Sequence, residues 1–215
     1  MTGRIVIDIF ATLDGVGQSP GGVEEDLEGG FRSGGWQGPL SDDAVGREVM
    51  AGIEALDALL LGRKTYDIWA SYWPRYRQGP ADPIAQKFNR VPKYVASRGQ
   101  PRLEWEGSVL LGSDVLGEVA ALRARHAEIH VVGSLDFAQT LLRAQAFDVL
   151  NLWTFPIVLG SGKRVFPPGV EPARLRLLEP PVVASTGAVL LRYGPDGRPR
   201  YGDIDPDRGT PVRSA

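Results

Sequence analysis

The chain has 215 residues, of which 43% are hydrophobic and 23% charged, and its formal net charge is −2; this is the composition of a globular protein with room for a sizeable core. So small a net charge gives no global reason to bind nucleic acid or an anionic membrane, and the lack of cysteine excludes disulfides and cysteine-based zinc sites. Because no apolar run reaches about 18 residues and the N-terminus lacks a signal-peptide pattern, we expect a cytoplasmic protein that does not cross a membrane.

The N-terminal part predicts a strand followed by a long irregular segment. Residues 4–13, "RIVIDIFATL", are rich in β-branched side chains, which favour a strand. The next residues, about 25 of them up to Pro39, are rich in glycine, and a segment of this length without regular structure is usually functional or disordered. Phe31 and Trp36 argue against disorder, because disordered linkers contain few aromatic residues.

Helices and strands alternate after this segment. Ser41 is predicted to cap a helix that ends near Leu56, since apolar residues recur at helical spacing between them. "DALLLG" predicts a buried strand, "KTYDIWASYW" and "DPIAQKFNRV" predict helices, and "PKYVASRG" and "GSVLLG" predict strands. "VLGEVAALRARH" predicts a helix, "EIHVVGS" a strand, "DFAQTLLRAQ" a helix and "FDVLNLWTFPIVLG" one long strand.

The pattern changes near the C-terminus. "RLRLLEPPVVASTGAVLLRYG" predicts two strands joined by a turn at "STG", with no helix between them. We therefore expect one α/β domain over residues 1–194, with a mostly parallel sheet that ends in antiparallel strands. Residues 195–215 are polar and rich in proline and glycine, which predicts a flexible tail.

Several familiar signatures are absent. No G-x-G-x-x-G follows the first strand, and "GSGKR" lacks both the first glycine of a Walker A motif, at Ile157, and the Ser or Thr that would follow Lys163. His126 and His130 are the only histidines and neither has a partner at metal-ligand spacing, so we expect no metal site. No G-x-S-x-G elbow is present.

The strongest functional pattern is a set of small or cationic residues at strand ends: "TLDGVG", "GRKT", "SR" and "GSLD". Ligands of α/β sheets bind beyond the carboxyl ends of the strands. Arg63 and Lys64 open a helix, where the helix dipole prefers negative charge, so an external anion is one explanation for them. Arg98 would join them in an anion pocket and Thr65 would add a hydroxyl. The alternative for each turn alone is an ordinary strand-to-helix connection.

Other polar and aromatic residues allow two interpretations. Asp42 and Asp43 either cap the helix that follows or act as proton donor or substrate anchor. Asp14 either forms a turn or faces a substrate. Aromatic side chains either wall a planar ligand or belong to the core or a dimer interface; the candidates for contact with the substrate are Asp14, Trp36, Tyr66 and Trp69.

The segments "DIFATLDG", "ALLLGRKTYD", "KYVASR", "IHVVGSLDFAQTLL" and "LWTFPIVLGSGKRVF" together resemble the dihydrofolate reductase-like superfamily over residues 4–193. The chain is most similar to stand-alone relatives of the reductase domain of bacterial riboflavin biosynthesis, the RibD C-terminal domain. The resemblance implies a three-layer fold around a mainly parallel sheet, NADPH as cofactor, and a homodimer. Without cysteine, a bifunctional riboflavin enzyme with its zinc-binding deaminase domain is excluded, and folate reduction is not supported.

Residue by residue, the resemblance implies a cofactor site built from the turns at the strand ends. The "GRKT" turn would bind the pyrophosphate and the adenosine 2′-phosphate, and the first-strand loop would cover the nicotinamide. The family's glycine pair often has a cis peptide; Gly133-Ser134 occupies that place here, and the sequence leaves its geometry open. The full set of implied cofactor residues is Ala11, Leu13, Gly15, Val16, Gly17, Gly62, Arg63, Lys64, Thr65, Ser97, Arg98, Gly133, Ser134, Leu135 and Asp136.

These observations predict an NADPH-dependent reductase that transfers a hydride to a small, pterin- or pyrimidine-like heterocycle. Hydride transfer requires little side-chain chemistry, since the cofactor carries the reaction. The alternative is a nucleotide-binding protein of the same fold without reductase turnover.

Overall fold

The computed structural model describes residues 2–76 and 79–202, and in them the chain forms a nine-stranded sheet. The strands lie in the order β4-β3-β2-β5-β1-β6-β9-β7, and β8 pairs with β9. Their bounds are β1 (Arg4–Thr12), β2 (Ala58–Gly62), β3 (Lys93–Ala96), β4 (Ser108–Leu110), β5 (Glu128–Val131), β6 (Val149–Phe155), β7 (Leu175–Leu177), β8 (Val182–Val183) and β9 (Val189–Pro195).

The directions of the strands confirm the predicted sheet. β1 to β6 pair in parallel, whereas β7 and β8 pair antiparallel with β9, and β9 pairs antiparallel with β6. Two details of the prediction are wrong. The long strand expected at 147–160 ends at Phe155, before Pro156. The C-terminal region has three strands in place of two, because the first predicted segment divides into β7 and β8 on either side of residues 178–181.

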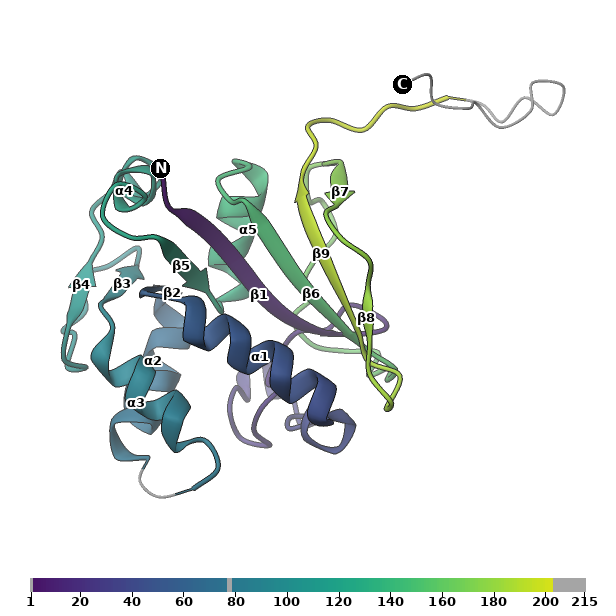
Figure 1. Ribbon diagram of the computed structural model, residues 1–215, viewed down its shortest axis with the longest axis horizontal. Coiled ribbons are helices and arrows are strands. Elements are labelled where there is room, and N and C mark those ends of the chain that lie inside the picture. Colours follow the sequence, from purple (N-terminus) through teal and green to yellow (C-terminus); the bar gives the residue numbers. More distant parts are fainter. Residues whose placement is uncertain (1, 77–78, 203–215) are drawn as a thin grey trace, which may run out of the picture.

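Helices cover both faces of the sheet (Figure 1). α4 (Val115–Leu122) and α5 (Leu135–Arg143) pack on one face, while α1 (Asp43–Ala55), α2 (Arg63–Tyr72) and α3 (Asp82–Arg90) pack on the other. Short 3-10 turns are η1 (Glu28–Gly30), η2 (Gly38–Leu40) and η3 (Trp73–Arg75). The expected three-layer α/β architecture is thus present.

Alternation along β1 divides the core into two sides. Ile5, Ile7 and Ile9 belong to the cluster that contains the α4 and α5 side chains. The side chains at the alternate positions, among them Asp8 and Phe10, point to the face that α1 covers, since successive strand residues point to opposite faces. Any polar residue at such a position is therefore placed under α1.

Asp42, and not Ser41, caps α1. Its Oδ1 accepts hydrogen bonds from the backbone N–H groups of Ala44 and Val45 at 2.9 and 3.0 Å, which satisfies two of the unpaired donors of a helix start. The helix therefore begins one residue later than a Ser41 cap predicts.

The Gly-rich segment has a defined path. Phe31 and Trp36 are buried, and the Trp36 indole N–H donates to the carbonyl of Gln18 at 2.9 Å. These contacts confirm that the two aromatic residues oppose disorder. At the other end of the chain, β9 continues to Pro195, one residue past the predicted domain boundary, and most of the expected tail lies outside the described residues.

Candidate functional site

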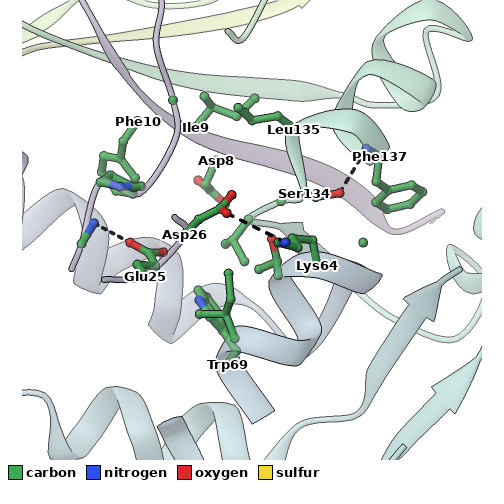
Figure 2. Close-up of a pocket in the computed structure, with 18 of the residues that line it drawn as sticks. Asp8, Ile9, Phe10, Glu25, Asp26, Lys64, Trp69, Ser134, Leu135 and Phe137 are labelled. Carbon is green, nitrogen blue, oxygen red and sulfur yellow. Dashed lines mark hydrogen bonds and ion pairs between the residues drawn. The ribbon is translucent and has the colours of Figure 1, made fainter. Parts of the chain in front are cut away.

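A cavity of about 1640 Å³ opens along the ends of β2, β3 and β5 and continues under α1 (Figure 2). It exceeds the roughly 300–1,000 Å³ of ordinary small-molecule sites, so it has room for two ligands. Many residues proposed from the sequence line it together: Gly17, Gly62, Arg63, Lys64, Thr65, Trp69, Ser97, Arg98, Gly133, Ser134, Leu135 and Asp136.

Two of the turns at this cavity pack backbone against backbone. The N–H of Gly62 donates to the carbonyl of Gly133 at 2.8 Å, and a Cβ at Gly62 would approach the backbone nitrogen of Ser134 to 2.7 Å. Gly133 has φ +142°, and a Cβ there would lie 2.5 Å from the Thr65 hydroxyl oxygen. The Gly133-Ser134 peptide bond, left open by the sequence, is cis. Glycine is required at both positions because two segments of the backbone meet there.

The start of α2 lacks negative charge of its own. Its N-cap is Gly62, which offers no side chain, and its first turn contains no acidic residue. Arg63 instead pairs with Asp67 one turn further on, at 2.7 Å, and Arg98 pairs with Asp136 at 2.8 Å. The free N–H groups and nearby cations are the usual elements of an anion site.

Acids from the Gly-rich segment reach this place. Lys64 lies 3.0 Å from Glu28 and 3.9 Å from Asp26, and Lys163 lies 2.6 Å from each of these carboxylates. Hydrogen bonds from Lys163 and Lys64 lower the pKa of Glu28 to about 2. Figure 2 shows Asp26 and Lys64 facing each other across the cavity. In this conformation, carboxylates of the chain itself are the anions beside Lys64.

The first-strand loop is fixed by the turn around residues 159–165. The N–H of Gly17 donates to the carbonyl of Lys163, and the N–H of Val165 donates to Gly15, at 2.9 and 2.8 Å. Asp14 accepts hydrogen bonds from the Thr12 hydroxyl and from the backbone of this turn; the Thr12 bond is the main cause that lowers the pKa of Asp14 to about 2. The "GSGKR" sequence therefore supports the loop, and only Gly17 of the proposed loop residues lines the cavity; Ala11, Leu13, Asp14, Gly15 and Val16 do not.

The acids proposed as catalytic are also outside the cavity lining. Asp42 caps α1 and its second oxygen accepts from the backbone and hydroxyl of Ser185, both at 2.7 Å. Asp43 occupies the first turn of α1 and does not line the cavity. The capping interpretation accounts for Asp42, and the structure does not bring either acid to the cavity.

Only one of the three aromatic candidates lines the cavity. Trp69 does so, stacked on Phe88 with ring centroids 4.8 Å apart. Tyr66 is buried, and its hydroxyl oxygen accepts from the backbone N–H of Trp105 at 3.0 Å. Trp36 packs against Phe155 in the core. Tyr66 and Trp36 thus follow the alternative in which aromatic residues belong to the core.

The sequence pattern missed a polar row on the sheet under α1. His130 of β5 is 3% exposed; its Nδ1 lies 2.6 Å from Asp8 of β1 and its Nε2 lies 3.0 Å from Glu128. Asn151 of β6 donates from Nδ2 to the other oxygen of Asp8 at 2.8 Å. Burial alone would lower the pKa of His130, but the charges and hydrogen bonds of Asp8 and Glu128 raise it to about 9. Asp8, His130 and Asn151 line the cavity.

The row continues to β9 and up to α1. Asp8 is in register with Asn151, which is in register with Arg192. Arg192 pairs with Glu48 of α1 at 2.5 Å, and both line the cavity. α1 passes close above the row, since a Cβ at Gly52 would meet the His130 ring at 3.3 Å.

Glu25 of the Gly-rich segment lines the cavity and has a raised pKa. Oε2 of Glu25 accepts from the backbone N–H groups of Gly21 and Gly22 at 2.8 and 3.1 Å. Burial is the main cause that raises the pKa of Glu25, against the effect of these hydrogen bonds.

A signal for the missed residues exists in the sequence, although it is weak. Asp8, His130 and Asn151 are each a polar residue inside an apolar strand segment, "IVIDIF", "EIHVV" and "VLNLW". Polar groups in buried strands require partners, so three such residues indicate a site once the strands are placed side by side.

Within residues 2–76 and 79–202, no group of three or more His, Asp or Glu side chains is placed to hold a metal ion. The helices of the same described residues are all too short or too polar to cross a bilayer.

The strand order and the cavity at the strand ends define a dihydrofolate reductase-like α/β protein. The chain belongs to the RibD C-terminal domain family, whose family model matches residues 4–185. Protein YyaP of Bacillus subtilis (strain 168) is 26% identical over 192 residues, which cover 88% of this chain and 94% of YyaP.

Solved structures share the fold at low identity. A pyrimidine reductase-like protein from Corynebacterium diphtheriae has a TM-score of 0.58 at 12% identity, with 90% of this chain and 92% of that chain covered. Dihydrofolate reductase from Enterococcus faecalis, solved with NADP(H), has a TM-score of 0.55 at 17% identity, with 91% and 98% covered. At these identities the likeness establishes the fold.

Proposed function

We propose that the protein is an NADPH-dependent reductase of a small heterocyclic, pterin- or pyrimidine-like compound. The observation that carries this proposal is the single cavity that joins the glycine-and-cation turns at one end to the polar row under α1 at the other. Membership of the RibD C-terminal domain family, and solved relatives described as reductases, support it.

The turns at the strand ends fit a dinucleotide phosphate. The uncapped start of α2 offers backbone N–H groups, and Arg63, Lys64 and Arg98 offer positive charge. Arg and Lys beside the adenosine end would favour the 2′-phosphate of NADPH over the hydroxyl of NADH. When bound, NADPH supplies the hydride; the protein binds, orients and excludes water.

Cofactor binding requires a local exchange of ion pairs. Lys64 can serve a phosphate only if the carboxylates of Glu28 and Asp26 withdraw from it or share it. Since Lys64 is about half exposed, the existing pairs are weak and can be exchanged. The Gly-rich segment would then rearrange as the cofactor enters.

Glu25 is the better candidate for the proton that accompanies reduction. It lines the cavity, unlike Asp42 and Asp43, and burial raises its pKa, which favours the protonated form of the carboxyl group. Replacement by Gln would preserve the hydrogen-bond acceptor for Gly21 and Gly22 while removing the proton.

The test is charge reversal at Lys64. Lys64→Glu is expected to raise the dissociation constant of NADPH about 100-fold, and that of NADH much less, because only NADPH carries the 2′-phosphate. Nucleotide fluorescence measures both constants. Arg102→Glu is the matched control, since Arg102 pairs with Glu104 at the surface and does not line the cavity. Equal losses for the two nucleotides would refute the assignment of Lys64.

NADPH oxidation with a panel of pterins and pyrimidines tests the reaction. Tight NADPH binding without turnover on any panel member would favour the alternative, a nucleotide-binding protein of the same fold.

The homodimer stays a prediction. Leu177, Leu178 and Val183 are exposed apolar side chains at the β7 and β8 edge, where a second copy could pack. Light scattering of the purified protein gives its mass in solution directly.

A further inference from the structure

The polar row is unusual for the interior of a sheet. Asp8, Asn151 and Arg192 stand in register on three neighbouring strands, and His130 adjoins Asp8 from a fourth. Burying charged groups costs free energy unless they are paired, and paired buried charges stabilise a fold no better than apolar packing does. A row of this kind along a cavity therefore indicates a binding role.

We propose that Asp8 is the anchor for a cationic nitrogen group of the substrate, an amidinium or ammonium that lies at the α1 end of the cavity. This inference rests on the proposed function in that the dinucleotide occupies the other end. Figure 2 shows the Asp8 carboxylate pointing into the cavity.

The hydrogen bonds of the row leave Asp8 as an acceptor. The His130 side chain is 4% exposed and both of its ring nitrogens face carboxylates, so it has no N–H left for a ligand. The Asp8 side chain is 20% exposed, and each of its oxygens uses one lone pair, on His130 or on Asn151. One lone pair on each oxygen remains for a donor that arrives through the cavity.

The position of Asp8 is fixed before a ligand arrives. His130 holds Oδ2 and Asn151 holds Oδ1, from the strands on either side of β1. A carboxylate held in this way loses little conformational entropy on binding, which favours affinity.

The charges of the row select the sign of the ligand. Its ion pairs form two groups. In the first, Asp8 and Glu128 are balanced by Arg4 and His130; in the second, Arg192 alone faces Glu48 and Glu179, which leaves one carboxylate in excess. The pKa of His130, about 9, keeps it among the cations at neutral pH. One negative charge thus remains, and a cationic ligand would balance it, whereas a carboxylate or phosphate at this end would be repelled.

Three flat probes of the same shape test the sign. Benzamidinium, benzamide and benzoate differ in charge but hardly in size, and calorimetry with the full chain measures their affinities. Benzamidinium is expected to bind at least about tenfold more tightly than benzoate, with benzamide between them. The proposal is overturned if benzoate binds as tightly as benzamidinium, or if benzamidinium does not bind. This test uses the wild-type protein alone.

Asp8→Asn tests the residue. The isosteric change is expected to weaken benzamidinium binding about tenfold or more and to leave benzamide nearly unchanged. Asp196→Asn is the matched control: Asp196 pairs with Arg174 at 2.7 Å, away from the cavity, and should have no effect. Unchanged benzamidinium affinity in folded Asp8→Asn protein would refute Asp8 as the anchor.

NADPH titration of the same samples separates this inference from the proposed function. If the wild type binds benzamidinium but not NADPH, the proposed reductase function is overturned and the assignment of Asp8 as the anchor stands. The reverse result would overturn the anchor and leave the reductase.

Discussion

The two ends of the cavity carry charge in opposite ways. At the strand-end turns, cations such as Lys64 and Arg98 are 48% and 90% exposed and pair with acids that solvent also reaches. Under α1, the His130 side chain is 4% exposed and its partners are fixed by sheet register. Exposed pairs exchange easily, while buried pairs resist exchange. The strand-end turns are therefore suited to exchange their own acids for a ligand, whereas the groups under α1 are suited to keep fixed positions.

The largest expected effect compares one ion pair from each end. His130→Leu leaves the Asp8 carboxylate without its cation and Glu128 with Arg4 alone, and it is expected to reduce the free energy of unfolding by about 3–5 kcal/mol. Arg98→Leu removes an exposed pair with Asp136 and should reduce it by no more than about 1 kcal/mol. Urea unfolding measures both. Similar losses in the two variants would contradict the difference between the ends.

The pH dependence of stability tests the same histidine. Folding raises the pKa of His130 from about 6.5 to about 9, so its contribution is complete below about pH 6.5 and is lost as the pH rises through 9. The loss is on the order of 3 kcal/mol.

Lys93 has the opposite effect on stability between about pH 8 and 10.5, which overlaps the His130 range, because burial lowers its pKa from 10.5 to about 8. The quantity to measure is therefore the difference in unfolding free energy between the wild type and His130→Gln across this pH range. A difference that does not change with pH would show that His130 is neutral in the folded protein.

A smaller effect tests the close packing of the turns. Gly62→Ala places a Cβ 2.7 Å from the Ser134 backbone nitrogen, so one turn must move; we expect a loss of about 1–3 kcal/mol and weaker NADPH binding. Gly46→Ala is the control, because a Cβ there meets open space on α1 and should stabilise the helix by up to about 1 kcal/mol. Thermal unfolding distinguishes the two; a stabilising Gly62→Ala would refute the contact.

The smallest expected effect concerns the acids beside Lys64. The double change Asp26→Asn and Glu28→Gln removes the carboxylates that compete with phosphate, so NADPH affinity should rise by up to about fivefold, the equivalent of one exposed ion pair. Glu104→Gln is the control. Weaker NADPH binding in the double variant would show that these acids help to hold the cofactor-binding conformation.

The exposed end of the cavity was largely predictable. Glycines and cations after a buried strand form a local pattern, and parallel strands bring their ends together, so "GRKT", "SR" and "GSLD" could be placed at one edge before the structure was known. What the sequence did not indicate is that Asp26 and Glu28, from the Gly-rich segment, lie beside Lys64. The path of such a segment depends on long-range contacts, for example Trp36 with Gln18 and Lys163 with both acids.

The buried end could not be predicted in the same way. Asp8 and His130 are 122 residues apart, and Asp8 and Asn151 are 143 apart, so no sequence spacing connects them. They meet because β5 and β6 flank β1, which is a property of strand order. Asp42 and Asp43 were more conspicuous, but their position at a helix start already had a sufficient structural explanation in capping.

The four-membered cluster of Lys64, Lys163, Asp26 and Glu28 also has a consequence for ionic strength. Added salt screens the attraction between a phosphate and Lys64, which weakens binding of a nucleotide. The same screening loosens the carboxylates that must leave Lys64, which favours binding. Because these two effects oppose each other, nucleotide affinity should vary less with salt than the charge of the nucleotide alone would suggest.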